Sequence, residues 1–427
     1  MKPQQLIEKI ENGELDGALK KVYVTDEAVA AQKPRYIRTA KEFINLFGND
    51  RDVFVLSAPG RTEVCGNHTD HNNGKVLAAS INLDAIAIAA KREDMTINEK
   101  SEGHNLNKVD ISSLAPNEAE YGKSSSMIKG VAAGLKEQGY NIGGFDACTT
   151  SDVMGGSGLS SSAAFEVLIA TVINHLYNDG KVDAVTVAKV SQFSENVYFG
   201  KPSGLLDQMA SSVGTFVTID FKDTKNPVIK KVDFDFAKSG YSLCIVDTHG
   251  NHSDLTDDYA AVRSEMEDVA KALGKNVLRE VEYDDFFAAL PELQQKVNDR
   301  ALLRAFHFFG ENERVDKAVS SLENNDFDGF KEAIIDSGMS SYLYNQNVYS
   351  PKTPTEQKLS LALCISEKLL KGRGAWRVHG GGFAGTIQAF VPNDMLDEYK
   401  NTIDNVFGDG SCHVLIVRPC GGTKVID

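Results

Sequence analysis

The feature that most constrains this chain is a ten-residue run of small residues that leads directly into an apolar segment. The run reads GGSGLSSSAA over residues 155–164, and the apolar segment spans Ser160 to Leu176. Apolar residues occupy nearly every helical face of the segment, which is typical of a helix buried within a domain. Glycines let the backbone approach a ligand, and the N-terminus of a helix attracts anions. The run therefore predicts a phosphate-binding loop, although serine is also a common helix cap.

The serines Ser160, Ser161 and Ser162 add hydroxyl groups that suit phosphate oxygens or a Mg²⁺ ion. No Gly-Lys-Ser/Thr follows the glycines, so the run is not the Walker A pattern. The glycine pattern by itself thus indicates an anion site without naming the nucleotide.

A second polar segment, residues 58–71 (APGRTEVCGNHTDH), directly follows the strand predicted at Asp52–Ser57. Burying its charged and amide side chains together would be costly unless they meet a ligand or one another. A polar surface turn explains the same pattern equally well. The candidate residues of this segment are Arg61, Asn67, His68 and Asp70.

Two more segments combine glycines with polar groups. In residues 195–208 (ENVYFGKPSGLLDQ) a glycine-containing break precedes Asp207, which suits a catalytic base but also a favourable partner of a helix dipole. Glu195 in this segment suits a metal ligand. Residues 379–386 (HGGGFAGT) contain four glycines, which indicates close backbone approach or a structural hairpin.

The remaining pattern predicts an α+β fold of two domains, residues 1–225 and 226–427, because helices and strands are mixed in both halves. Strands are predicted at 75–90, 145–151, 216–221, 242–247, 387–391 and 413–417, and helices at 127–138, 160–176, 184–199, 257–273, 302–322 and 355–370.

Charge and cysteine usage restrict the partners and the compartment. The chain carries 45 basic and 60 acidic residues, a formal charge of −15, which argues against a nucleic-acid partner. No run reaches the roughly 18 apolar residues of a membrane span, and Met1–Lys21 lacks the apolar stretch of a secretory signal. The scattered cysteines predict free thiols, buried for Cys148, Cys244 and Cys364. A cytoplasmic protein is expected, with its oligomeric state left open.

Taken in order, the four segments resemble the GHMP kinase superfamily, and within it galactokinases, over about residues 38–392. The galactokinase signature PGRVNLIGEHTDY corresponds to PGRTEVCGNHTDH at 59–71, and the superfamily loop PxGxGLSSSA to VMGGSGLSSSA at 153–163. The family's GIMDQ appears as GLLDQ at 204–208, and its GGGFGG as GGGFAG at 380–385.

The resemblance implies a small-molecule sugar substrate and an active site in the cleft between the two domains. ATP would bind at Gly155, Gly156, Ser157, Gly158, Leu159, Ser160, Ser161 and Ser162. Ser161 and Glu195 would hold Mg²⁺. Asp207 would accept the proton of the sugar C1 hydroxyl, and Arg61 would stabilise the ionised Asp207 and the transferring phosphoryl group. The sugar contacts implied are Asn67, His68, Asp70, Gly204 and, through a looser alignment, Tyr259.

The departures from the family pattern leave alternatives open. The signature Glu, which contacts the hydroxymethyl end of the sugar in the family, is Asn67 here, and Glu63 and His71 also differ from the pattern. An amide in place of a carboxylate could admit a C6 carboxylate, so galacturonate or another modified galactose is an alternative substrate. A non-catalytic sugar sensor is a second alternative, against which the intact Ser160–Ala163 stretch argues. A mevalonate or amino-acid kinase is a third, against which His68-Thr69-Asp70 argues.

Overall fold

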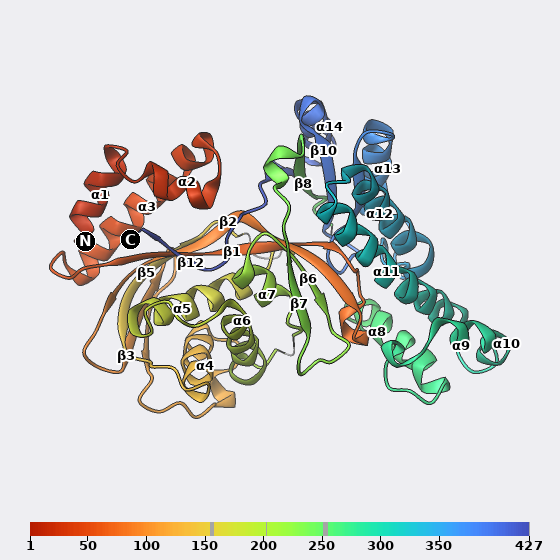
Figure 1. Ribbon diagram of the computed structural model, residues 1–427, viewed down its shortest axis with the longest axis horizontal. Helices are drawn as coiled ribbons and strands as arrows, with labels where there is room; N and C mark the ends of the chain where they lie inside the picture. Colours follow the sequence, from red (N-terminus) through yellow and green to blue (C-terminus); the bar gives the residue numbers. More distant parts are fainter. Residues whose placement is uncertain (154–157, 202, 251–254, 427) are drawn as a thin grey trace. The chain divides into compact units, whose positions relative to one another are not determined.

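The computed structural model describes residues 1–153, 158–201, 203–250 and 255–426 (Figure 1). The chain divides into two units. The first unit comprises Met1–Arg61, Ser80–Thr215 and Arg418–Asp427, and the second comprises Thr62–Ala79 and Phe216–Val417. Each unit contains both helices and strands, which confirms the expected two-domain α+β fold.

These units differ from the expected division at residue 225. The main change of unit falls between Thr215 and Phe216, and the segment Thr62–Ala79 belongs to the second unit. The C-terminal segment returns to the first unit because β12 (Thr423–Ile426) pairs with β1 (Phe54–Cys65), with Val55 opposite Ile426. Such pairing between distant parts of the chain leaves no local sequence signal.

The first unit is built on a sheet with the strand order β12-β1-β2-β5-β3-β4. β2 pairs antiparallel with β5, and β5 pairs parallel with β3. The side chains of β2 are buried along most of its length, so it shows the continuous apolar run of a strand covered on both faces. The strands not yet bounded are β2 (Lys75–Lys91), β3 (Thr96–Ser101), β4 (Leu106–Asp110) and β5 (Phe145–Ser151).

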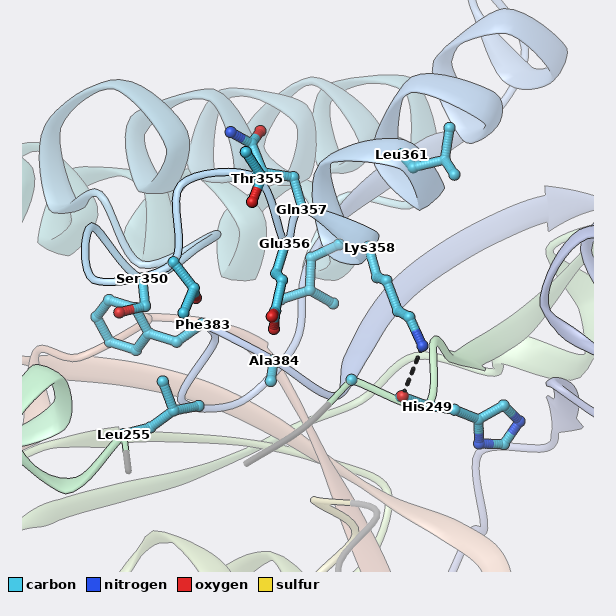
Figure 2. A pocket seen from close by; sticks show the side chains of 13 residues that line it. His249, Leu255, Ser350, Thr355, Glu356, Gln357, Lys358, Leu361, Phe383 and Ala384 are labelled. Atoms are coloured by element: carbon cyan, nitrogen blue, oxygen red, sulfur yellow. Dashed lines mark hydrogen bonds between the residues drawn. The ribbon is translucent and has the colours of Figure 1, made fainter. Parts of the chain in front are cut away.

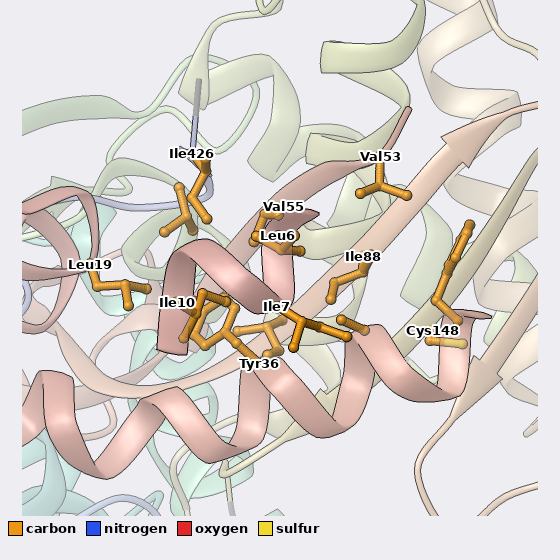
Figure 3. Close-up of a cluster of buried hydrophobic side chains, with 14 of the residues drawn as sticks. Leu6, Ile7, Ile10, Leu19, Tyr36, Val53, Val55, Ile88, Cys148 and Ile426 are labelled. Atoms are coloured by element: carbon orange, nitrogen blue, oxygen red, sulfur yellow. The ribbon is translucent and has the colours of Figure 1, made fainter. Parts of the chain in front are cut away.

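Helices cover both faces of this sheet (Figure 1). One face carries α1 (Pro3–Glu11), α2 (Asp16–Tyr23) and α3 (Asp26–Phe47), whose apolar side chains pack against β1, β2, β5 and β12 (Figure 3). The Thr25 side chain caps α3 by accepting from the Ala28 N–H. The other face carries α4 (Ser124–Glu137), α5 (Ser161–Tyr177), α6 (Ala184–Phe193), the π-helical turn η3 (Ser194–Phe199) and α7 (Leu206–Val213).

The second unit contains a four-stranded antiparallel sheet in the order β11-β8-β10-β9. A ribbon of β6 (Phe216–Asp220) and β7 (Val228–Val232) pairs with the Lys75–Ala79 part of β2. The four strands of the sheet are β8 (Tyr241–Asp247), β9 (Ala375–Val378), β10 (Thr386–Pro392) and β11 (Cys412–Leu415).

In addition to these strands, the second unit contains helices. They are α8 (Thr256–Ala272), α9 (Tyr283–Ala288), α10 (Leu290–Leu293), α11 (Asp299–Glu323), α12 (Phe327–Ser340), the π-helical turn η6 (Ser341–Asn345), α13 (Lys358–Leu370) and α14 (Leu396–Phe407). Among the described residues, none of the helices has both the length and the apolar character that a membrane span requires. All six cysteines are free, and Cys364 on α13 is exposed, so the prediction that it is buried was wrong.

Candidate active site

Arg61 and Asp207 form an ion pair in the first unit. Arg61 is the last residue of β1 within this unit, and its Nε lies 2.7 Å from Asp207 Oδ1 in the first turn of α7. The Arg61 guanidinium also donates to the Gly158 carbonyl, and the Ser160 hydroxyl donates to the second oxygen of Asp207. Residues from the segments 58–71 and 195–208 thus meet the glycine run at the Asp207 carboxylate.

The surroundings of Asp207 keep its carboxylate ionised. Burial by itself would raise the pKa of this carboxyl, but the charge of Arg61 and the hydrogen bonds from Ser160 and Arg61 more than offset burial. The net pKa therefore lies below its ordinary value. The side chain is still 32% exposed, so the charged oxygen atoms remain accessible to a substrate hydroxyl.

The end of the glycine run and the start of α5 lie against β1. A Cβ atom at Gly60 would come 2.8 Å from the Leu159 carbonyl oxygen, so only glycine permits this close approach. Ser160 has a left-handed backbone (φ 61°), which is uncommon outside glycine, and α5 begins at the next residue. Of the predicted ATP-binding residues, Gly155, Gly156 and Ser157 lie outside the described residues.

Glu195 lies in the π-helical turn η3, and each of its two carboxylate oxygen atoms accepts two hydrogen bonds. Oε1 accepts from Ser162 Oγ (3.1 Å) and Lys201 Nζ (2.7 Å), and Oε2 accepts from Ser203 Oγ (2.5 Å) and Gln208 Nε2 (2.9 Å). The serine whose hydroxyl contacts Glu195 is Ser162, whereas the role of Ser161 as a Mg²⁺ ligand stays a prediction. Neighbouring residues on a helix point about 100° apart, so only one of them faces η3.

A carboxylate beside a serine hydroxyl fits Mg²⁺, which binds hard oxygen donors and takes its remaining ligands from phosphates and water. The Lys201 ammonium, 57% exposed, already lies against Glu195 Oε1, which shows that this oxygen attracts a cation. Within the described part of the chain, no group of three or more His, Cys, Asp or Glu side chains forms a complete metal site. A cation at Glu195 would thus depend on the nucleotide for most of its ligands.

Glu166 on α5 was missed by the sequence reasoning. It is fully buried, and Gln208 Nε2 donates to it (3.2 Å) as well as to Glu195. Burial, and then the nearby charge of Glu195, raise the pKa of Glu166 to about 9, so this carboxyl is neutral at pH 7. The signal was present in the sequence, because Glu166 is the one charged residue in the apolar segment Ser160–Leu176.

The sugar-signature segment lies in the second unit, where Asn67 is fully buried and saturated with hydrogen bonds. Its Nδ2 donates to Glu63 Oε1 (2.9 Å) and to the Gly380 carbonyl (2.7 Å). Its Oδ1 accepts from Asn347 Nδ2 (2.8 Å) and Ser341 Oγ (3.4 Å). The amide of Asn67 therefore has no free position for a direct sugar contact in this arrangement.

The Glu63 carboxylate lies directly beside Asn67, the residue at the signature position. Its Oε1 accepts from Asn67 and from Arg377 Nη2, 2.8 Å away, and Arg377 is completely buried. The Glu63 side chain is 13% exposed. Neither the ion pair nor the role of Arg377 was predicted, because Arg377 lies on β9, far away in the sequence and outside every motif.

The glycine loop 380–385 lies against the signature segment. His68 Nε2 donates to the Gly381 carbonyl (2.9 Å), and the Tyr259 hydroxyl donates to the Gly382 carbonyl (3.0 Å). The Tyr259 ring lies so close that a Cβ at Gly381 would be 2.6 Å from it. The structure thus brings together three features that the sequence analysis singled out, namely His68, Tyr259 and the glycine loop.

The other two predicted sugar contacts lie at separate places. Asp70 begins the short 3-10 turn η1 (Asp70–Asn72) in the second unit, two residues after His68. Gly204 is exposed and belongs to the first unit, three residues before Asp207.

A cavity of about 480 Å³ opens elsewhere in the second unit (Figure 2). Leu255, Phe383, Ala384 and the segment around Glu356 line it, and Lys358 Nζ donates to the His249 carbonyl at its edge (2.9 Å). The predicted site residues are not among the described residues that line this cavity. Among the described lining residues, Phe383 and Ala384 belong to the glycine loop.

Comparisons with known proteins assign the fold and the site to a class. Residues 97–215 match the model of the GHMP kinases N-terminal domain, and residues 41–91 match the galactokinase galactose-binding signature. A mevalonate kinase structure shares the fold, with a TM-score of 0.59 at 13% identity over 85% of this chain and 99% of that one. The chain is thus a GHMP-type kinase, a phosphotransferase with an alcohol acceptor.

Individual relatives narrow the class. The galactokinase of Streptomyces coelicolor is 32% identical over 86% of this chain and 92% of its own, and that of Clostridium tetani is 31% identical over 86% and 90%. The structure of Lactococcus lactis galactokinase complexed with galactose matches with a TM-score of 0.73 at 25% identity, covering 90% of this chain and 98% of that one. The chain belongs to the galactokinase family.

Proposed function

We propose that this enzyme transfers the γ-phosphoryl group of ATP to the C1 hydroxyl of galactose. The observation that carries the proposal is the contact of Arg61, Ser160 and the ionised Asp207 at the N-terminus of α5. It places a base, a cation and an anion-binding helix terminus together, and phosphoryl transfer requires mainly positioning and charge neutralisation.

Each residue of this group has a definite part in the proposed reaction. Asp207 orients the C1 hydroxyl and accepts its proton as the phosphoryl group is transferred. Arg61 keeps Asp207 ionised and offsets negative charge on the phosphoryl oxygens. The α5 N-terminus and the hydroxyls of the glycine run hold the phosphates. Mg²⁺, held by Glu195 and Ser162, would neutralise phosphate charge when bound.

For the sugar, we propose that His68, Asp70 and Tyr259 take the contacts that the family resemblance implies. Asn67 acts indirectly, because its amide holds Glu63 and the glycine loop in place. The Glu63 carboxylate then takes the place of the missing signature Glu and repels a C6 carboxylate. Galactose is therefore favoured over galacturonate.

A requirement for both units follows from where these groups lie. Arg61, Ser162, Glu195 and Asp207 belong to the first unit, whereas the signature segment and Tyr259 belong to the second. We propose that turnover requires both sets of residues. We also propose a cytoplasmic location, which the six free cysteines support.

The test is ADP release with Mg-ATP and a panel of galactose, galacturonate, N-acetylgalactosamine, glucose and arabinose. Galactose is expected to give the highest kcat/KM. Preference for galacturonate would contradict the role given to Glu63. Binding of galactose and ATP without ADP release would contradict the proposed activity and favour the sensor.

A further inference from the structure

Helix α3 contacts the chain just before the proposed ATP loop. Residues 1–40 lie outside both matched family models, which cover residues 41–91 and 97–215. Asp152 lies directly after β5 and three residues before Gly155. On α3, Arg35 Nη1 donates to Asp152 Oδ2 (2.6 Å) and Gln32 Nε2 donates to the same oxygen (3.0 Å).

Gln32 also contacts Arg35, the other donor to Asp152. Its Oε1 accepts from Arg35 Nη1 (2.6 Å) while its Nε2 donates to Asp152, so both ends of one amide are used at this contact. Arg35 is 4% exposed, but the Asp152 side chain is 35% exposed. The contact therefore joins the buried Arg35 to the partly exposed Asp152, directly after the end of β5.

Charge balance explains why Asp152 is held there. The buried side chains Arg35 and Arg418 both bind Asp84, at 2.7 Å and 3.0 Å. Asp84 provides one negative charge for two positive ones, and Asp152 provides the second. An unpaired charge is expensive inside a protein, so the position of Asp152 is tied to the network through Arg35.

The backbone is fixed at the same place. The Asp152 N–H donates to the Asp84 carbonyl (3.0 Å), and Arg35 Nη2 donates to that carbonyl as well (2.8 Å). Within the proposed loop, Arg61 binds the Gly158 carbonyl. The described chain before residue 154 and after residue 157 is thus held by an arginine at each point, one on α3 and one on β1.

We propose that α3, through Gln32 and Arg35, is a positioning element for the ATP loop and sets the affinity for ATP through Asp152. This inference rests on the proposed role of residues 155–162 in binding ATP. In this proposal Gln32 and Arg35 act through Asp152 and not by contact with substrate. Their effect should therefore appear in ATP binding and leave sugar binding unchanged.

The test compares Gln32→Met, Asp152→Asn and the double variant with Asn45→Met, an exposed position on the same helix. The measurements are the KM for ATP, the KM for sugar, the melting temperature, and calorimetric binding of a non-hydrolysable ATP analogue. In Gln32→Met and in Asp152→Asn, we expect the KM for ATP and the dissociation constant of the analogue to rise on the order of five- to tenfold, because each variant loses a charge-assisted hydrogen bond. The double variant should bind ATP no more weakly than Asp152→Asn alone, since both changes remove the same contact.

Unchanged ATP binding in both single variants would overturn the inference. So would a parallel loss of ATP and sugar binding with a lower melting temperature, which is the result of a merely structural role. Wild-type turnover separates the two proposals. If the wild type phosphorylates galactose, the proposed function stands whatever these variants do, and analogue binding tests the positioning role even without turnover.

Discussion

At the scale of single residues, the polar side chains of the site differ in whether the protein already uses them fully. Asp207 is held by Arg61 and Ser160 but remains partly exposed, so it is available to a substrate. Asn67 is buried, and all its hydrogen-bonding positions are taken. Direct chemistry is thus expected of Asp207, and an indirect effect through Glu63 is expected of Asn67.

The substitution Glu63→Gln tests this indirect effect. Loss of the carboxylate leaves the Arg377 cation unpaired beside the signature segment, where it attracts a C6 carboxylate. We expect the ratio of kcat/KM for galacturonate to that for galactose to rise about tenfold. The ratio does not depend on how much protein is folded. The exposed Glu282→Gln serves as the control, and an unchanged ratio in Glu63→Gln would refute the role of Glu63.

His307 on α11 supports the signature segment and makes the second unit sensitive to acid. Its Nε2 donates to the Asn67 carbonyl (2.9 Å), and burial lowers the pKa of His307 to about 4. Between pH 6.5 and 4 the unfolded chain binds the proton and the folded chain does not, so stability falls as the pH falls.

The variant His307→Gln should remove this part of the acid sensitivity. Between pH 6.5 and 4 the wild type should lose about 3 kcal/mol more unfolding free energy than His307→Gln does. Denaturant unfolding at several pH values measures this difference. The exposed His104→Gln should behave like the wild type, and equal pH dependence of the wild type and His307→Gln would disprove the assignment.

At the scale of elements, each helix and strand predicted from local periodicity is present, but many further helices and strands were not predicted. The apolar segment Ser160–Leu176 forms α5 (Ser161–Tyr177), and β5 has the predicted bounds Phe145–Ser151. The helix expected over 184–199 ends at Phe193 and continues as η3, because hydrophobic spacing does not distinguish α from π hydrogen bonding. Helices α1–α3 were not predicted, although the apolar residues Leu6, Ile7 and Ile10 of α1 recur with helical spacing.

The glycine loop provides a prediction at this scale. Gly382 has φ 78°, and a Cβ there would lie 2.0 Å from the Asn347 carbonyl oxygen, whereas Gly372 has φ 79° with open space around it. Both alanine variants have the same strain from a positive φ angle. Gly382→Ala should lose at least about 2 kcal/mol more stability than Gly372→Ala because it also clashes. Equal losses of unfolding free energy would mean that the loop can move away from Asn347.

At the scale of the whole molecule, the sequence singled out segments that contain the contacts described above, but it did not predict all of these contacts. The pairing of Arg61 with Asp207 follows the family resemblance. The contacts of Ser162, Glu166 and Arg377 were not predicted, because they depend on helix rotation and on strands distant in sequence. The division into units was also missed in part, since β12 returns to β1 from the end of the chain.

The most direct test of the account is phosphorus NMR of the product formed from galactose and ATP by the wild type and by Asp207→Asn. The wild type should form a phosphate ester at C1. Asp207→Asn should turn over about 10³-fold more slowly while binding both substrates within several-fold of normal, because the base acts mainly in the chemical step. A phosphate at another carbon, or near-normal turnover by Asp207→Asn, would contradict the mechanism.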